Sequence, residues 1–495
     1  MKLNKKALMI AGAAAMLTIG AAIPSFAAAG GWATEGDNWC YLDAQGNKMT
    51  NVWKKSGNEW YYLGSDGLMA TDTWVDDTSY VDIYGVRVTN RWIYTEAGTD
   101  NAPNFEGGWY YLDAAGKAVT DGWKTINNKK YYFDSDGTMK YGWYTDGSDT
   151  YYLGDENNGA AATGWLCLDF DKDNLPDDGD VSEQETTGSD TAKWFYFLSN
   201  GKAVKADNDT YTSKTISGKK YYFDSNGVML TGWVSMSSEG DSSAVDPTGI
   251  SSFKYFGDDN DGQMSKGWKY LSDFPEDSDD SSSIVEATSS DAQRYGSSEG
   301  NGSWYYFDSN GKPKYLRADA NSMSKATVRI NGQSYFFDEY GKMQYGLVSI
   351  DFGDGTEHSA YFGNSESDGK MRTDKQTSVT EDSGDRSTFF FETSGSDKGA
   401  GVSGDKKGYL YYNGKLVTAD KGTTTQVFEV NDKLYLVNES GQIQKSNKCY
   451  KSDGDYRYEI ANGKLYEVDA DKTRLGEVTS GETLPEISFK DTYRL

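Results

Sequence analysis

The fold of this chain is decided by residues 31–74, which read GWATEGDNWCYLDAQGNKMTNVWKKSGNEWYYLGSDGLMATDTW. The stretch holds five tryptophans with gaps of 7, 14, 7 and 14 residues between them: Trp32, Trp39, Trp53, Trp60 and Trp74. A single globular core has no need of such regular spacing. A tandem repeat of about 21 residues does, and self-similarity at such periods is typical of stacked repeat architectures.

The repeat continues beyond this stretch. Tyr-Tyr-Phe-Asp-Ser-Asn/Asp-Gly occurs at residues 131–137, 221–227 and 305–311. Tyr and Phe favour strands, and Asp-Ser-Asp-Gly supplies turn residues. We expect each copy to be a β-hairpin that turns at Asp-Ser-Asp-Gly and closes at the next Gly-Trp. A linker such as residues 124–129 then leads to the next copy.

Composition agrees with thin hairpins. Apolar residues make up only 37% of the chain, whereas aromatic residues reach 14%. Isolated hairpins are marginally stable in water, so the aromatic faces are expected to lie between consecutive hairpins. The sequence therefore predicts an all-β fold, an elongated solenoid of stacked aromatic-rich β-hairpins with a repeat of about 20 residues.

Composition also divides the chain into segments. Lysines near the N-terminus, followed by an apolar run, predict a secretory signal peptide. A retained membrane anchor is disfavoured because the apolar run is short. Low hydrophobicity and high charge mark acidic insertions. The expected segments are 1–29, signal peptide; 30–165, N-terminal repeats; 166–193, acidic insertion; 194–380, further repeats with an acidic Ser-rich insertion near 271–300; and 381–495, divergent Tyr-based repeats.

The net charge restricts the partners. It is −27 for the whole chain and becomes −30 when signal cleavage removes three lysines. A chain this acidic has no basic patch for nucleic acid or anionic lipid, so we expect neither nucleic-acid nor membrane binding after cleavage. Cys40, Cys167 and Cys449 lie far apart, and Cys40 occupies a position that holds Tyr61 and Tyr110 in other copies, which disfavours a disulfide framework.

No catalytic residue is predicted. His358 is the only histidine, which excludes zinc sites built on histidine pairs, and its context indicates a solvated loop. A pair of carboxylates as in glycosidases stays open among 76 acidic residues. Repeats nevertheless fill every stretch long enough for a catalytic domain, so we expect a protein that is not an enzyme.

One acidic loop has the spacing of a calcium site. Its acids stand at positions 1, 3, 5, 9 and 12 of a calcium-type loop: Asp169, Asp171, Asp173, Asp177 and Asp180. Against calcium, Asn174 replaces the usual glycine, Pro176 constrains the loop, and position 12 lacks the long bidentate Glu. A solvated acidic loop is the preferred interpretation, with calcium as the alternative and no other cofactor expected.

The aromatic pattern itself suggests a binding site. Trp53 ends one expected hairpin, Trp60 begins the next, and Trp74 follows one period after Trp53. Rings from neighbouring copies can then meet in one shallow groove. Such a cage suits a quaternary ammonium through the ring quadrupole, or a sugar through stacking. The alternative is that the rings only hold the hairpins together.

These motifs resemble a known family. Gly31-Trp32 with Trp39, and Trp60-Tyr61-Tyr62-Leu63 with Gly67 and Met69, are similar to the choline-binding, or cell-wall-binding, repeats of Gram-positive bacteria. Residues 126–139 are more similar to the related clostridial-toxin and glucan-binding repeats. The resemblance is clear over residues 31–380 and weak over 385–495. It implies a solenoid of hairpins and non-covalent binding to the choline of wall teichoic acid, or to wall or extracellular glycans.

The resemblance also implies ligand residues, because in that family a closing Trp, the next unit's first aromatic residue and a third aromatic residue form the cage, commonly with a Met. The implied cages are Trp32/Trp39/Trp53 and Trp53/Trp60/Trp74, with Met49 and Met69 nearby, and Trp109 and Trp123 are further candidates. Lys130 and Lys220 stand where other copies have the first aromatic residue. A lysine there would repel choline but could hydrogen-bond a sugar.

The sequence thus predicts a secreted, non-enzymatic cell-wall-binding repeat protein, attached non-covalently to the surface of a Gram-positive bacterium through aromatic cages. An exported glucan- or carbohydrate-binding adhesin is the alternative. A cell-wall hydrolase of the amidase type is less favoured, because the sequence shows no domain for it.

Overall fold

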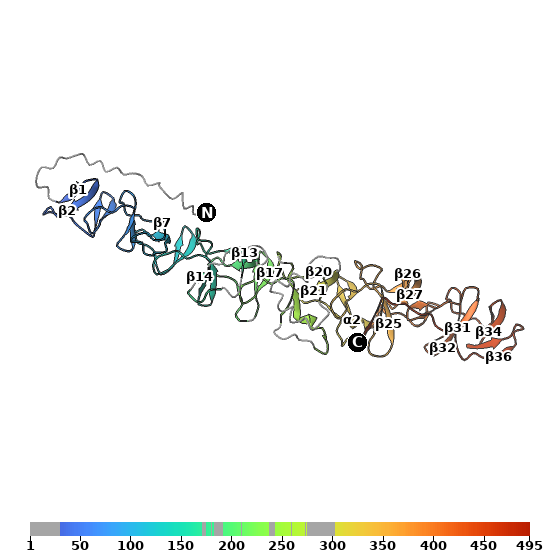
Figure 1. Cartoon of the computed structure of the whole chain (residues 1–495). Helices are drawn as coiled ribbons and strands as arrows, with labels where there is room; N and C mark the ends of the chain where they lie inside the picture. Colours follow the sequence, from blue (N-terminus) through green and yellow to red (C-terminus); the bar gives the residue numbers. More distant parts are fainter. Residues whose placement is uncertain are drawn as a thin grey trace. The chain divides into compact units, whose positions relative to one another are not determined.

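The computed structural model describes residues 30–170, 175–179, 181–182, 192–208, 210–236, 243–258, 260–272, 274 and 302–495. The expected signal peptide, half of the first acidic insertion and most of the second lie outside the described residues. The chain divides into two compact units, each built from consecutive hairpins (Figure 1). The first runs to Thr212 and includes Phe223–Met229, and the second comprises Ser213–Tyr222 and Leu230–Leu495.

Regular structure in the first unit is entirely β among the described residues. Its strands are β1 Gly31–Glu35, β2 Asn38–Leu42, β3 Val52–Ser56, β4 Glu59–Leu63, β5 Thr73–Val75, β6 Ser79–Val81, β7 Arg91–Thr95, β8 Gly108–Leu112, β9 Gly122–Ile126, β10 Lys129–Phe133, β11 Trp143–Asp146, β12 Asp149–Tyr152, β13 Gly164–Asp169, β14 Val181–Ser182 and β15 Ala192–Phe197. The hairpin of β16 Thr212–Ile216 and β17 Lys219–Phe223 follows.

In its described residues, the second unit adds two short helices to its strands. Its elements are β18 Trp233–Ser235, η2 Ile250–Ser252, β19 Phe253–Tyr255, β20 Gly267–Ser272, β21 Gly302–Phe307, α2 Met323–Ala326, β22 Thr327–Ile330, β23 Gln333–Phe336, β24 Leu347–Asp351, β25 Glu357–Tyr361, β26 Asp374–Thr380, β27 Arg386–Phe391, β28 Gly404–Lys406, β29 Tyr409–Tyr412, β30 Lys415–Leu416, β31 Thr425–Val430, β32 Lys433–Asn438, β33 Cys449–Ser452, β34 Asp455–Ala461, β35 Lys464–Val468, β36 Arg474–Glu477 and β37 Asp491–Arg494. The prediction of an all-β fold made of stacked aromatic-rich hairpins is confirmed. In the part of the chain that the structure describes, no helix could cross a membrane.

The hairpins have a different phase from the predicted one. Strand β9, which begins at Gly122 and carries Trp123, pairs antiparallel with β10, so that Tyr132 lies opposite Trp123. The turn between them is Asn127-Asn128, with φ of +49° and +63°, the backbone of a type I′ turn that matches the strand twist. The predicted linker is therefore the hairpin turn. The expected pairing through Asp-Ser-Asp-Gly was wrong, because that turn is followed by only a single bridge, Phe133 to Met139.

The segment after each Asp-x-x-Gly turn joins one hairpin to the previous one. One backbone amide of this segment donates a hydrogen bond to a backbone carbonyl of the previous hairpin. The acceptor is the second or third residue of that hairpin's second strand. We call the donor the docking residue. The donor and acceptor pairs include Met69 to Trp39, Arg87 to Trp60, Met139 to Trp109, Ala161 to Lys130, Met229 to Trp194, Met264 to Lys220 and Met343 to Trp304, at 2.7–2.9 Å.

Six of these docking side chains lie under the turn glycine of the following hairpin: Met69, Arg87, Met139, Ala161, Met264 and Met343. At Gly159, φ is +58°, and an added Cβ would lie 2.2 Å from the Sδ of Met139. A side chain there would be strained in its backbone and would collide with the docking residue. The glycines of the repeat therefore serve both the turn and the stacking.

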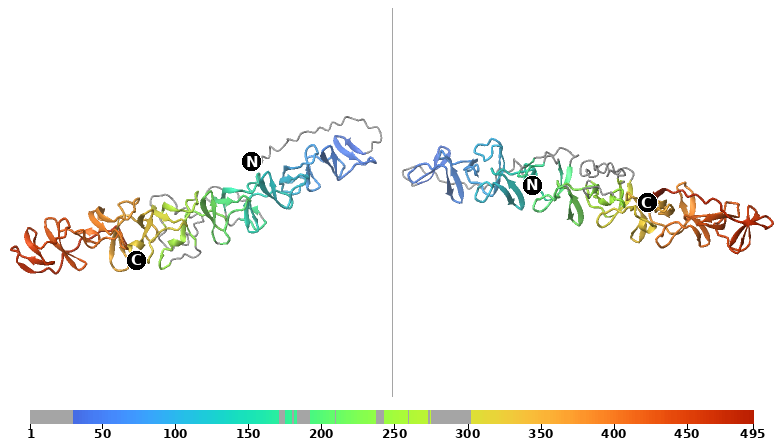
Figure 2. Two further views of the ribbon diagram at one scale, coloured as in Figure 1. Left: turned by 180° about the vertical axis from the view of Figure 1, so that it is seen from behind. Right: turned by 90° about the horizontal axis from the view of Figure 1, so that it is seen from below.

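The last residues of the chain return along the second unit. Strand β37 pairs parallel with β24, although 139 residues, 352–490, lie between the two strands in the sequence. Figures 1 and 2 show the C-terminus beside the segment with α2 and β25, away from β34 and β36. Tyr493 of β37 packs edge-on against Phe336, with ring centroids 4.9 Å apart.

A buried carboxylate fixes part of this return. The Glu381 side chain is 2% exposed and pairs with Lys415 at 2.8 Å. It also accepts hydrogen bonds from the Ser387 hydroxyl at 2.5 Å and the Ser488 amide at 3.0 Å. These contacts hold the Glu381 pKa below its ordinary value against the opposing effect of burial. The C-terminal segment thus closes the edge of one hairpin and satisfies a charge buried beside it.

Candidate aromatic binding sites

The strand register places two aromatic positions of each hairpin on one face. In β1 and β2, Trp32 lies opposite Tyr41 and Thr34 lies opposite Trp39. Alternate residues of a strand share a face, so Trp32 and Trp39 are diagonal neighbours on the same side of the hairpin. The 7-residue gap between tryptophans therefore lies within one hairpin, and not between two hairpins as the sequence analysis assumed.

The first site is formed by Trp32 and Trp39. Their ring centroids are 6.5 Å apart and their planes are nearly perpendicular, at 83°. Tyr61 of the next hairpin packs 5.4 Å from Trp32, and the amide of Met69 bonds to the Trp39 carbonyl. Both indoles are half-buried, so ring surface remains open beside them. The structure thus joins three of the predicted residues, with Tyr61 in contact with Trp32.

The same geometry recurs at two further hairpins. Trp165 and Trp194 have centroids 6.3 Å apart at 83°, and Trp268 and Trp304 have centroids 6.4 Å apart at 81°. The docking residues are again methionines, Met229 and Met343. Sequence reasoning missed these two sites because long insertions separate the two tryptophans of each pair. A signal was available in the sequence. Each insertion is preceded by Gly-Trp and followed by a Trp with two aromatic residues directly after it.

The pair Trp53 and Trp60 differs, because a cation of the chain lies on it. The Cζ atom of Arg87 is 5.3 Å from the ring centroid of Trp53 and 5.3 Å from that of Trp60. Arg87 is the docking residue, in the position that Met69 has one hairpin earlier. The indole of Trp53 also donates a hydrogen bond to Asp76 Oδ2 at 2.9 Å.

A second internal cation lies on Trp123. The Nζ of Lys130 is 3.7 Å from the Trp123 centroid and 5.0 Å from that of Tyr151. The Trp123 indole donates to Asp146 Oδ2 at 3.3 Å. Burial lowers the pKa of Lys130. The lysine expected to repel a cation from outside therefore occupies the aromatic surface itself.

The other predicted residues take structural positions. Trp74 is 1% exposed, packs on Tyr110 and donates to Thr95 Oγ1 at 3.0 Å. Trp109 is 2% exposed and lies under Tyr94. Met49 is one position beyond the docking position, since its amide bonds to Tyr41 of its own hairpin. Trp74 and Trp109 belong to the stacking of hairpins, and Met49 does not occupy the docking position of an open pair.

The calcium loop stays a prediction. Asp171, Asp173 and Asp180 lie outside the described residues, while Asp169 ends β13 and Asp177 is exposed. Among the described residues, no three His, Cys, Asp or Glu side chains are arranged to hold a metal ion. His358 is in β25 and not in a loop, with Asp354 3.5 Å away.

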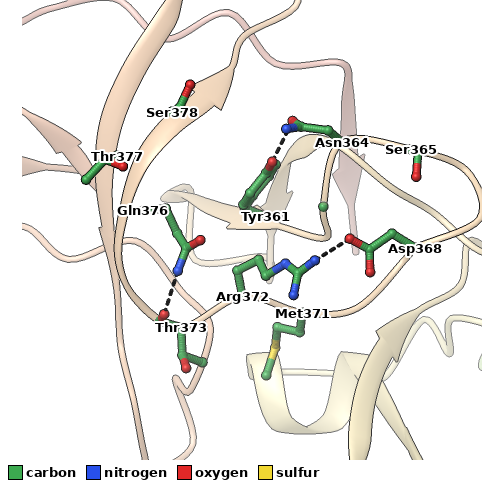
Figure 3. A pocket seen from close by; sticks show the side chains of 11 residues that line it. Tyr361, Asn364, Ser365, Asp368, Met371, Arg372, Thr373, Gln376, Thr377 and Ser378 are labelled. Atoms are coloured by element: carbon green, nitrogen blue, oxygen red, sulfur yellow. Dashed lines mark hydrogen bonds and ion pairs between the residues drawn. The ribbon is translucent and has the colours of Figure 1, made fainter.

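A polar cavity of about 610 Å³ lies in the second unit (Figure 3). Its wall contains the ion pair of Arg372 with Asp368, and the Tyr361 hydroxyl, which donates to Asn364 at 2.5 Å. Gln376 lies across from them and donates to the carbonyl of Thr373 at 2.9 Å. Such amides, charges and hydroxyls can donate to and accept from sugar hydroxyls.

Comparison with known families agrees with this architecture. The choline-binding repeat model matches residues 47–86 in one form and residues 119–165 and 212–244 in another, and a putative cell wall binding repeat matches residues 299–312. Within these ranges the chain matches choline-binding and cell-wall-binding repeats. The resemblance seen in the sequence is confirmed, and the matched residues include strands from both units.

Individual relatives carry similar repeats in other contexts. Glucosyltransferase-S of Streptococcus mutans is 34% identical over 194 residues, which are 32% of this chain and 13% of that protein. The chain therefore spans a small part of this curated relative. Among solved structures, choline binding protein F of Streptococcus pneumoniae, in the presence of a peptidoglycan analogue, is 22% identical with a TM-score of 0.37, over 72% of this chain and 98% of that one. The modular autolysin LytC of the same species is 22% identical with a TM-score of 0.35, over 65% of this chain and 55% of that one.

Proposed function

We propose that this chain is a surface-binding protein that holds choline groups at three aromatic sites and acts by binding, without catalysis. The sites are Trp32/Trp39 with Met69, Trp165/Trp194 with Met229, and Trp268/Trp304 with Met343. The observation that carries the proposal is the recurrence of one geometry. Three indole pairs share centroid distances of 6.3–6.5 Å and interplanar angles of 81–83°.

The chemistry of this geometry favours a quaternary ammonium. Two perpendicular indoles offer a face and an edge around one point, and a methyl-bearing cation is attracted to the negative ring face without needing hydrogen bonds. The net charge of −27 adds a long-range attraction for cationic groups. At about 0.5–2 kcal/mol per ring, two rings supply roughly 1–4 kcal/mol, which corresponds to weak binding at a single site.

Weak sites suit attachment to a polymer. A wall teichoic acid bearing many choline groups lets the second and third sites bind at high effective concentration, which raises the overall affinity by about 10²–10⁴-fold where the geometry permits. The natural partner we propose is therefore a choline-bearing polymer of a Gram-positive cell wall, and the location is the bacterial surface. The match to wall-binding repeats supports this assignment.

The test is retention on immobilised choline. The purified chain should bind a choline-derivatised resin, elute with free choline, and pass through an ethanolamine resin, whose ammonium lacks the methyl groups. The triple variant W32A/W165A/W268A should lose retention, whereas W92A, which changes a half-buried tryptophan outside the three pairs, should keep it. Equal retention on both resins would contradict a choline site.

Glycan binding is the second candidate. The polar cavity at Tyr361, Asp368 and Arg372 favours it, and so does the match to part of a glucosyltransferase. An array of wall and extracellular oligosaccharides tests this function independently of choline. Binding that is lost in R372A and kept in the triple tryptophan variant would assign a sugar to the cavity.

A further inference from the structure

Two aromatic pairs in the first unit differ in a shared way from the pairs Trp32/Trp39 and Trp268/Trp304. In each, the closing tryptophan, Trp53 or Trp123, donates its indole N–H to a carboxylate 23 residues later, Asp76 or Asp146. In each, a cationic side chain of the chain lies over that same ring. The three open pairs instead have a methionine at the docking position.

We propose that Arg87 and Lys130 are built-in cationic ligands that close the Trp53/Trp60 and Trp123/Tyr151 sites to choline. This inference rests on the proposed choline binding at the other three sites. It makes the number of working sites smaller than the number of aromatic pairs in the sequence. It also identifies a tethered cation, Arg87 at the docking position or Lys130 opposite Thr125 in its hairpin, as the feature that closes a pair.

Arg87 is held in place by more than its charge. Its amide donates to the Trp60 carbonyl at 2.8 Å, which fixes the backbone beside the ring it covers. Its side chain runs under the next turn, since a Cβ added to Gly116 would lie 2.7 Å from the Arg87 Cδ. The Nε of Arg87 is buried and makes no hydrogen bond within the described residues. The guanidinium thus uses its flat, weakly hydrated faces, as stacking on aromatic rings requires.

Lys130 reaches its ring from a different position. It is the second residue of its hairpin's second strand, where Trp39, Trp60 and Trp109 stand in earlier copies. Its Nζ lies 3.7 Å from the Trp123 centroid, within the range of a strong cation–π contact. The lowered pKa of Lys130 agrees with a charge withdrawn from water between two rings. The same blocked state therefore arises from two sequence positions.

Choline at such a site must displace a cation that is already tethered there. The tethered cation has no translational freedom to lose, whereas a free ligand does, so the internal cation holds the advantage at millimolar choline. Methionine at the docking position carries no charge and leaves the ring faces to an external cation. Replacing Arg87 with methionine should therefore open the Trp53/Trp60 site.

Fluorine NMR of the full chain labelled with 5-fluorotryptophan tests this site by site. Resonances are assigned by single Trp→Phe variants, and choline is titrated into the wild type, R87M and the control R91M, which removes the same charge at an exposed position. We expect the resonances of Trp53 and Trp60 to keep their chemical shifts during the titration of the wild type and R91M. In R87M, the same resonances should shift along a saturable curve. K130W provides a second variant, read through the resonance of Trp123.

The outcomes separate this inference from the proposed function. Choline binding at the open sites is measured by the shifts of the Trp32, Trp165 and Trp268 resonances in the wild type. This result does not depend on the result for the Arg87 variant. Saturable shifts of Trp53 or Trp123 in the wild type would overturn the inference. So would the absence of any shift at these rings in both R87M and K130W, provided that the dispersed spectrum shows folded protein.

Discussion

The carboxyl of Asp338 should make the stability of its neighbourhood depend on pH. Asp338 follows β23, is 8% exposed, and accepts hydrogen bonds from the amides of Lys342 and Tyr340 and from Gln344 Nε2 at 2.8–3.0 Å. Burial nevertheless raises its pKa to about 7. The perturbation is therefore a change of pH, and the matched variant is D338N, which keeps the shape of the side chain but does not titrate.

The sign follows from the two pKa values. The carboxyl titrates near 3.9 in an unfolded chain and near 7 in the fold, so the unfolded state loses its proton first as the pH rises. The stabilisation is complete below about pH 4 and is lost as the pH rises through 7. A shift of about 3 units corresponds to roughly 4 kcal/mol, of which about 3 kcal/mol is lost between pH 5 and 8.

Hydrogen exchange measured by mass spectrometry on peptides covering β23 and β24 gives the free energy of local opening. After correction for intrinsic exchange rates, the wild type should lose up to about 3 kcal/mol between pH 5 and 8, while D338N should stay nearly flat. A wild type as flat as D338N, or one that gains protection as the pH rises, would refute this account of Asp338.

Three further predictions concern the stacking. G159A should lower the melting temperature more than G147A, because both glycines have positive φ, of +58° and +63°, but only Gly159 faces a docking residue; equal shifts of the two variants would contradict the role given to Met139. E381A should cost about 3 kcal/mol in urea unfolding, because the Ser387 hydroxyl and the Ser488 amide lose their acceptor and Lys415 keeps only its bond to the Glu486 carbonyl; a change below about 1 kcal/mol would argue against a stabilising role of the Glu381 carboxylate. Y493A should weaken the packing of β37 by about 2 kcal/mol, seen as faster hydrogen exchange in β24 but not in β31; unchanged exchange in β24 would show that the return strand does not protect it.

Much of the fold could be read from the spacing of aromatic residues. The period of Trp32, Trp39, Trp53 and Trp60 predicts stacked hairpins, and Cys40 is buried as Tyr61 is in the next copy. The phase of the hairpin could not be read in the same way, because two turn signals compete in each repeat. Asn127-Asn128 adopts the type I′ turn, while Asp134 to Gly137 leads into the docking segment.

The site was harder to predict than the fold. The wrong phase assigns Trp53 and Trp60 to different hairpins and adds Trp74 to their cage, whereas the two residues share one hairpin and Trp74 is buried. Arg87 was missed because its position over two rings follows only from the hydrogen bond of its amide to Trp60. The pairs Trp165/Trp194 and Trp268/Trp304 were missed because the sequence distance within each pair hides a register identical to that of Trp32 and Trp39.

The measurement that tests the central claim most directly is the number of choline molecules bound per chain, from equilibrium dialysis with radiolabelled choline carried to saturation. The account predicts three for the wild type, and two for each of W32A, W165A and W268A. No saturable binding, or a count that none of these three variants lowers, would contradict the assignment of choline to the open tryptophan pairs.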